Sequence, residues 1–155
     1  RYAASGQIYK NKLYVFGGWH NLAPDKQGKM NWLETTFFND LHVLDLENWH
    51  WTHITTNTSP PSPRCQSVSF LIDEYFVIYG GAYHKVEKGQ STSVFILDDV
   101  WFLDLDTLVW IKGFNSKQLC LGTCTPIGKG KYYFIGGVKG WDATAALNSG
   151  VVVWD

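Results

Sequence analysis

One block of sequence recurs three times in this chain, and this repetition constrains the fold more than any other feature. Without gaps, residues 1–18 read RYAASGQIYKNKLYVFGG, 64–81 read RCQSVSFLIDEYFVIYGG, and 120–137 read CLGTCTPIGKGKYYFIGG. Each copy joins two runs rich in small and apolar residues through a polar turn and stops at paired glycines, which predicts two strands in a hairpin. A single unit of this kind cannot bury its own apolar faces, so the copies must stack against one another.

A second block follows the first after a variable loop. Residues 40–51 read DLHVLDLENWHW and 99–110 read DVWFLDLDTLVW, while the third copy begins with GVVVWD at residues 150–155. Each complete unit therefore contains four expected strands, named here A to D: A and B precede the diglycine, and C and D follow the variable loop. Trp51 and Trp110 close the units, and we expect both indoles to be buried within or between units.

These features together resemble Kelch repeats: the diglycine, the Asn39-Asp40-Leu41 and Asp98-Asp99-Val100 entries to the C strand, and the closing tryptophans. The resemblance covers essentially the whole chain. It implies an all-β β-propeller with blades of four antiparallel strands, here about three blades of a larger propeller. Blade 1 spans about 1–54, blade 2 about 64–113 and a partial blade 3 about 120–155. In the ungapped alignment, Cys120 of the third repeat stands where Arg1 and Arg64 stand in the others.

Three repeats are few for a propeller. Closed propellers typically have about 4 to 8 blades, so we expect the remaining blades to come from the same protein or from another chain. In the first variable loop, Phe37 and Phe38 are expected to cover the edge of the adjacent blade. In the second, Phe95-Ile96-Leu97 is expected to extend the C strand or lie on the fold.

The composition excludes several classes of function. The formal net charge is −1, and no dense run of Lys or Arg offers a surface for nucleic acid. The apolar stretches are of strand length and broken by polar turns, so we expect no membrane-spanning segment. The three cysteines are an odd number without a disulfide framework, which favours a reducing compartment. We expect a cytoplasmic protein, with the nucleus as the alternative.

The residues that could carry chemistry do not form a recognisable constellation. The five histidines are scattered along the chain; His20 and His84 follow successive diglycines and could meet across blades, but two histidines are too few for a structural zinc site. Asp45 and Asp104 recur at the same place in successive units, which indicates a structural role. We therefore expect a non-enzymatic protein without a cofactor or metal. The alternative is a propeller enzyme similar to galactose oxidase, which uses copper, or a carbohydrate-binding propeller.

The loops that join B to C strands, and the links from D to the next A strand, are expected to emerge on one face of the propeller and bind a peptide or partner protein. Kelch propellers similar to this one often act as ubiquitin-ligase substrate receptors or as scaffolds. In the family, contacts commonly come from residues just after the diglycine and just after the A-strand arginine. Carried over by position, the expected partner-binding residues are Tyr2, Trp19, His20, Gln66, Tyr83, His84, Lys139 and Trp141.

Overall fold

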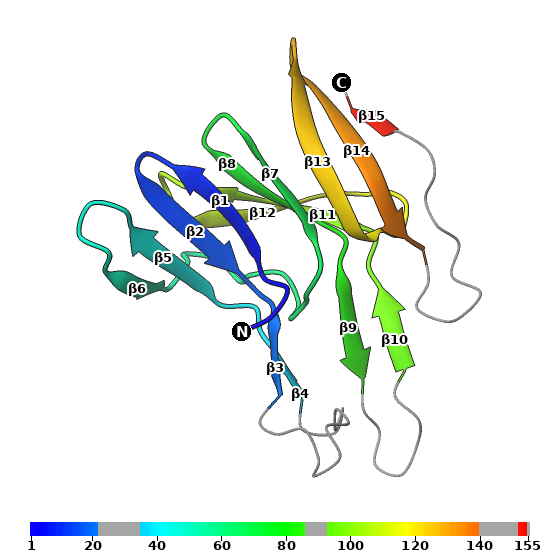
Figure 1. The fold of residues 1–155 in the computed structure, drawn as a ribbon, viewed down its shortest axis with the longest axis horizontal. Helices are drawn as coiled ribbons and strands as arrows, with labels where there is room; N and C mark the ends of the chain where they lie inside the picture. The colour runs from blue at the N-terminus through cyan, green and yellow to red at the C-terminus, as the bar shows by residue number, and fades with distance from the viewer. Residues whose placement is uncertain (22–34, 86–92, 140–151, 155) are drawn as a thin grey trace.

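The computed structural model describes residues 1–21, 35–85, 93–139 and 152–154, and all regular structure among them is β-strand. The strands form three larger antiparallel sheets that lie side by side, with two short hairpins below them (Figure 1). This arrangement confirms the all-β fold and the four-stranded blades that the repeats predicted.

The first two sheets are complete blades, and the third has three described strands. Blade 1 contains β1 (Ser5–Tyr9), β2 (Lys12–Phe16), β5 (Leu41–Asp45) and β6 (Trp51–Ile54), hydrogen-bonded in that order. Blade 2 contains β7 (Val68–Ile72), β8 (Tyr75–Tyr79), β11 (Asp99–Asp104) and β12 (Val109–Asn115). Blade 3 contains β13 (Cys120–Gly128), β14 (Lys131–Val138) and β15 (Val152–Trp154). The expected strands A to D correspond to these strands in sequence order.

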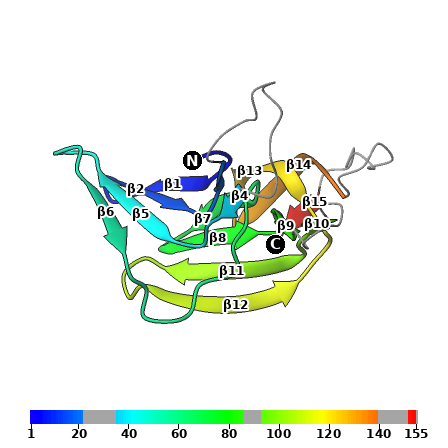
Figure 2. The same ribbon diagram turned by 90° about the horizontal axis from the view of Figure 1, so that it is seen from below.

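The A strands lie at the inner side of the assembly, and the D strands β6 and β12 lie at its periphery (Figure 2). Side chains of β1 reach β7 directly, because Ser5 donates to the Ser67 carbonyl at 3.2 Å and Gln7 to the Ser69 carbonyl at 2.9 Å. The small residues at the start of the A strands therefore stand where neighbouring blades come closest.

Each of the first two variable loops begins and ends with a short strand, and these two strands pair to form a hairpin. β3 (Trp19–Asn21) pairs with β4 (Thr35–Phe37), and β9 (Ala82–Lys85) pairs with β10 (Ser93–Ile96). Both hairpins extend to the same side of the blades (Figure 1). The expectation for Phe95-Ile96-Leu97 holds in part. Leu97 lies on the fold, where its N–H donates to the Gly81 carbonyl at 2.8 Å, whereas Phe95 and Ile96 do not extend the C strand. They pair with β9 in a separate sheet, because the loop has enough strand-forming residues at both ends to close on itself.

The core consists of two layers, one on each side of blade 2. Strand residues alternate between faces, so Phe76, Ile78 and Leu103 point toward blade 1, while Val77 and Val100 point toward blade 3. All five side chains are fully buried. A blade between two neighbours needs apolar residues on both faces, and this explains why β8 reads as an unbroken apolar run.

The diglycines connect each blade to the next. The Gly18 N–H donates to the Arg64 carbonyl at 2.8 Å, and the Gly81 N–H donates to the Leu119 carbonyl at 2.8 Å. Gly17 has φ +68°, and a Cβ added there would lie 2.7 Å from the Arg64 carbonyl oxygen. Only glycine allows both this backbone conformation and this close approach.

The third repeat is shifted by one residue relative to the ungapped alignment. The carbonyl of Leu119, not that of Cys120, accepts the hydrogen bond from the Gly81 N–H, and Cys120 pairs with Val138 as Tyr2 pairs with Trp19. The assignment of Cys120 to the arginine position was therefore wrong. The cause is an extra residue in the hairpin between β13 and β14, where the register shifts near Pro126 and Gly128.

We expected both Trp51 and Trp110 to be buried, and this holds for Trp110 alone. Trp110 is 5% exposed and its ring lies 5.0 Å from that of Phe16 in blade 1, whereas Trp51 is 50% exposed. Trp51 occupies the equivalent place in blade 1, on the face that points away from blade 2. Among the residues that the structure describes, no further blade covers this face.

The prediction for the first loop is confirmed for Phe37, whose ring stacks on His84 of blade 2 with centroids 5.4 Å apart. The Phe38 ring instead packs within its own blade, where the Arg1 guanidinium lies 4.3 Å from the ring centroid, while the Phe38 carbonyl accepts from the Arg64 N–H of blade 2 at 3.0 Å.

Candidate functional site

The first candidate surface lies on the hairpin side of the blades, where Tyr2 precedes β1 and Trp19 begins β3. Tyr2 and Trp19 exchange two backbone hydrogen bonds, of 2.8 and 2.9 Å, and their ring centroids lie 5.0 Å apart. Tyr2 is 60% exposed. The structure therefore brings these two predicted residues together as an aromatic pair, with Tyr2 exposed and Trp19 half-buried.

Two more predicted residues are stacked on the hairpins. The Tyr83 ring lies parallel to that of Phe95 at 5.1 Å, and His84 stacks on Phe37 of the neighbouring blade. Burial lowers the pKa of His84 below its ordinary value of 6.5, so the imidazole is neutral at physiological pH. These stacks place aromatic rings on both hairpins. The backbone of His20 pairs with Thr36 in the first hairpin. That His20 and His84 meet across blades stays a prediction.

Gln66 joins all three blades near their inner edge. Its N–H donates to the Ala3 carbonyl at 2.9 Å, and its carbonyl accepts from the Leu121 N–H at 3.0 Å. Its side-chain Oε1 is buried and accepts no hydrogen bond from the described residues. Such an acceptor suits a donor group on a ligand, because a buried polar atom without a partner is costly.

The last two predicted residues do not join this group. Lys139 is exposed and borders a separate small cavity of about 90 Å³ together with Tyr79 and Phe134. Trp141 lies outside the described residues.

An arginine–carboxylate pair holds the end of each complete blade. In blade 2, Arg64 is 1% exposed and donates to both oxygens of Asp99, at 2.7 and 2.9 Å. Burial alone would raise the pKa of Asp99, but the hydrogen bonds from Arg64 outweigh it and hold the pKa below the usual 3.8. In blade 1, Arg1 donates to Asp40 at 2.7 Å in a more exposed setting. These arginines are therefore structural.

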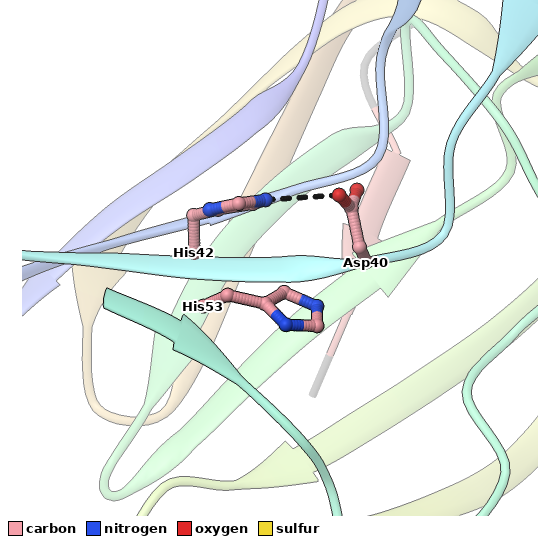
Figure 3. Close-up of side chains that lie close together, drawn as sticks. All are labelled: Asp40, His42 and His53. Carbon is pink, nitrogen blue, oxygen red and sulfur yellow. Dashed lines mark hydrogen bonds and ion pairs between the residues drawn. The ribbon is translucent and has the colours of Figure 1, made fainter. Parts of the chain in front are cut away.

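A cluster that the sequence reasoning missed lies beside the Arg1 pair. Asp40, His42 and His53 come from the start of β5 and from β6, and their ligand atoms lie within 4.8 Å of one another (Figure 3). His42 Nε2 is 2.9 Å from Asp40 Oδ2. The signal was present in the sequence, because a two-residue period and a C–D hairpin place Asp40, His42 and His53 on one face. Finding it required the pairing register of His42 with His53.

A cavity of about 390 Å³ adjoins this cluster. Asp40 and His53 line it together with Thr58 and with Trp110 of blade 2. Two of the lining residues carry buried polar atoms without a hydrogen-bond partner among the described residues, namely Asp40 Oδ1 and Trp110 Nε1. The cavity wall thus mixes polar residues such as Asp40, His53 and Thr58 with the apolar Leu41, Pro60 and Trp110.

The three cysteines lie in or next to the core. All three are free; Cys65 and Cys120 are buried and Cys124 is partly buried. Burial raises the pKa of Cys65 and Cys124 to about 12 and that of Cys120 to about 11. The inferred reducing compartment stays a prediction.

We expect these thiols to react very slowly with Ellman's reagent at pH 8 in the native protein, because the thiolate is the reactive form. After denaturation all three should react within the mixing time of a manual assay. Rapid reaction of any of them in the native state would contradict the burial described here.

Three features define the class of protein: four-stranded antiparallel blades, diglycines that bind the next blade, and hairpins on one side. It is a β-propeller segment. The chain belongs to the Kelch-repeat family, since residues 1–137 match the KLHDC2/KLHL20/DRC7 Kelch-repeats domain.

Similar proteins are considerably longer than this chain. Kelch domain-containing protein 2 of Bos taurus is 30% identical over 132 residues, which cover 79% of this chain and 29% of that protein. Tip elongation aberrant protein 1 of Schizosaccharomyces pombe is 34% identical over 116 residues, 72% of this chain and 8% of that protein. The solved structure of YjhT matches with a TM-score of 0.57 at 20% identity, covering 89% of this chain and 34% of that one. That likeness shows the propeller fold.

The described residues contain no helix that is long and apolar enough to cross a membrane.

Proposed function

We propose that this chain is part of a non-enzymatic propeller that binds a peptide or partner protein on its hairpin side. The observation that carries the proposal is the aromatic pair of Tyr2, which is 60% exposed, and Trp19. Gln66, whose N–H donates to the carbonyl of the neighbouring Ala3, adds a buried Oε1 without a hydrogen-bond partner among the described residues. Aromatic side chains dominate interface energies, and a fixed acceptor can orient a peptide. Membership of the Kelch-repeat family supports a protein-interaction role at the coarse level.

The finer roles extend this proposal. A substrate receptor of a ubiquitin ligase and an assembly scaffold would both use the same surface, and the identity of the bound protein would separate them. A cytoplasmic location, with the nucleus as the alternative, fits either role.

We also propose that further Kelch blades complete the ring. At Gly17 an added Cβ would meet the first residue of the next blade, whereas at Gly136, the equivalent glycine of blade 3, it meets no described atom within 4 Å. The exposed Trp51 at the other end supports the same conclusion. An electron-density map in which residues 1–155 of the intact protein form a closed three-bladed ring would refute it.

The binding surface can be tested by affinity capture from cell extract, with the intact protein as bait and mass spectrometry as the readout. We expect Tyr2→Ala/Tyr83→Ala to lose the specifically retained proteins, because each buried interface aromatic can contribute about 2 kcal/mol or more. A matched control is Ile111→Ala, which removes a 46% exposed side chain on the peripheral strand β12.

The thermal unfolding midpoints of the two variants should be measured before the capture, so that only variants of similar stability are compared. If the double variant retains the same proteins as the wild type, the hairpin side is not the binding surface. If only the Ile111 variant loses them, the peripheral edge is the working surface and the proposal fails.

A further inference from the structure

The side chains of Asp40, His42 and His53 occupy one face of blade 1 because of strand geometry. His42 in β5 stands directly opposite His53 in β6, and Asp40 precedes His42 by two residues. Cross-strand partners share a face, and so do residues two apart. The two imidazole rings accordingly lie with centroids 5.1 Å apart, and the Asp40 carboxylate lies next to them (Figure 3).

Blade 2 shows which part of this cluster the fold itself requires. There Asp99 replaces Asp40, and Trp101 Nε1 donates to Asp99 Oδ2 at 2.8 Å, just as His42 Nε2 meets Asp40 Oδ2. Lys112 stands opposite Trp101, as His53 stands opposite His42. The arginine, the carboxylate and one ring N–H thus recur as structure, whereas a pair of imidazoles is present in blade 1 and absent from the equivalent positions of blade 2.

The carboxylate also has an unused coordination position. Asp40 Oδ2 receives both Arg1 and His42, while Oδ1 is buried and has no hydrogen-bond partner among the described residues. Asp40 and His53 line the cavity of about 390 Å³ described above. A ligand bound to Oδ1 would satisfy this oxygen without breaking the ion pair between Arg1 and Oδ2.

We propose that Asp40, His42 and His53 form a binding site for a divalent first-row transition-metal ion of the zinc or copper class. Two imidazoles and one carboxylate are ligands that these ions prefer, and three protein ligands leave a coordination position open. Metal–ligand bonds of about 2.0 to 2.1 Å place tetrahedral donors roughly 3.3 Å apart, so atoms within 4.8 Å of one another need only side-chain rotation. With three ligands and a guanidinium nearby, the site binds more weakly than a four-ligand structural zinc site.

The first test is a zinc titration of the intact protein against a chromogenic chelator. We expect one site that depends on both histidines. The variant His42→Trp/His53→Lys copies the residues of blade 2, so it retains the ring donor to Asp40 and should fold. We expect it to weaken zinc binding at this site by about tenfold or more. His50→Gln is the matched control, because His50 lies three residues before His53 and outside the cluster.

A spectroscopic readout identifies the ligands. Electron paramagnetic resonance of the protein with one equivalent of Cu²⁺ should show coupling to two imidazole nitrogens, and the double variant should lose this signal while the His50 variant keeps it. Zinc binding that is unchanged in the double variant, or a wild-type protein that binds no zinc or copper at this site, would overturn the proposal. Neither result depends on the identity of a protein partner, so the test is independent of the proposed function.

Discussion

Replacing Arg64 with methionine is expected to lower the free energy of unfolding by about 3 to 5 kcal/mol, because it leaves a partly buried carboxylate without its cation. Arg64 is 1% exposed and donates to both oxygens of Asp99. It also donates to the Gly80 carbonyl at 3.1 Å and, through Nε, to the Ser62 carbonyl at 3.0 Å. One side chain therefore joins the D–A link, the diglycine and the C strand of blade 2. Urea denaturation of the intact protein measures the effect.

The equivalent variant of blade 1, Arg1→Met, is the matched control. The Arg1 and Asp40 side chains are 24% and 28% exposed, so that pair should contribute about 1 kcal/mol or less. The effect of Arg64→Met should also depend on pH. The pKa of Asp99 lies below 3.8 in the folded protein, so the contribution of the pair is present above that pH and is lost as the pH falls through the folded pKa. Equal effects of the two substitutions at neutral pH would contradict the structural role of Arg64.

Replacing Gly80 with alanine is expected to destabilise the protein by about 3 kcal/mol or more. The backbone at Gly80 has φ +62°, which costs an L-residue roughly 1 to 2 kcal/mol. The added Cβ would also overlap the Leu119 carbonyl, where the chain enters blade 3. This contact is with backbone, so the whole start of blade 3 must move to relieve it. Thermal unfolding followed by circular dichroism reports the loss.

A second glycine separates the two causes. Gly130 has φ +72°, but a Cβ added there meets no described atom within 4 Å. Gly130→Ala should therefore show the backbone strain alone and cost about 1 to 2 kcal/mol. If both alanine variants unfold at the same midpoint, the diglycine does not act by holding the next blade.

Parts of the candidate site could be predicted from the sequence, and parts could not. Tyr2 and Trp19 could be named because they follow fixed positions of a repeat, and the structure brings them together; their binding role stays a prediction. Phe37 was expected to reach the next blade and does so. The hairpins β3–β4 and β9–β10 were missed, since short strands in a variable loop have no repeating partner to reveal them. The misalignment of Cys120 with the arginine position has a related cause, because an ungapped alignment cannot locate one extra residue in a hairpin.

The sequence by itself determined the blade. Apolar periodicity, polar turns and paired glycines recur at matching spacing, and these are local properties that each repeat specifies for itself. Only the tertiary structure decided what depends on distant residues: that Trp110 is buried while Trp51 is exposed, and that His42 faces His53. Exposure depends on whether another blade covers the face, and ligand geometry depends on strand register. Both follow from packing between segments, because identical local patterns acquire different surroundings at different places in the ring.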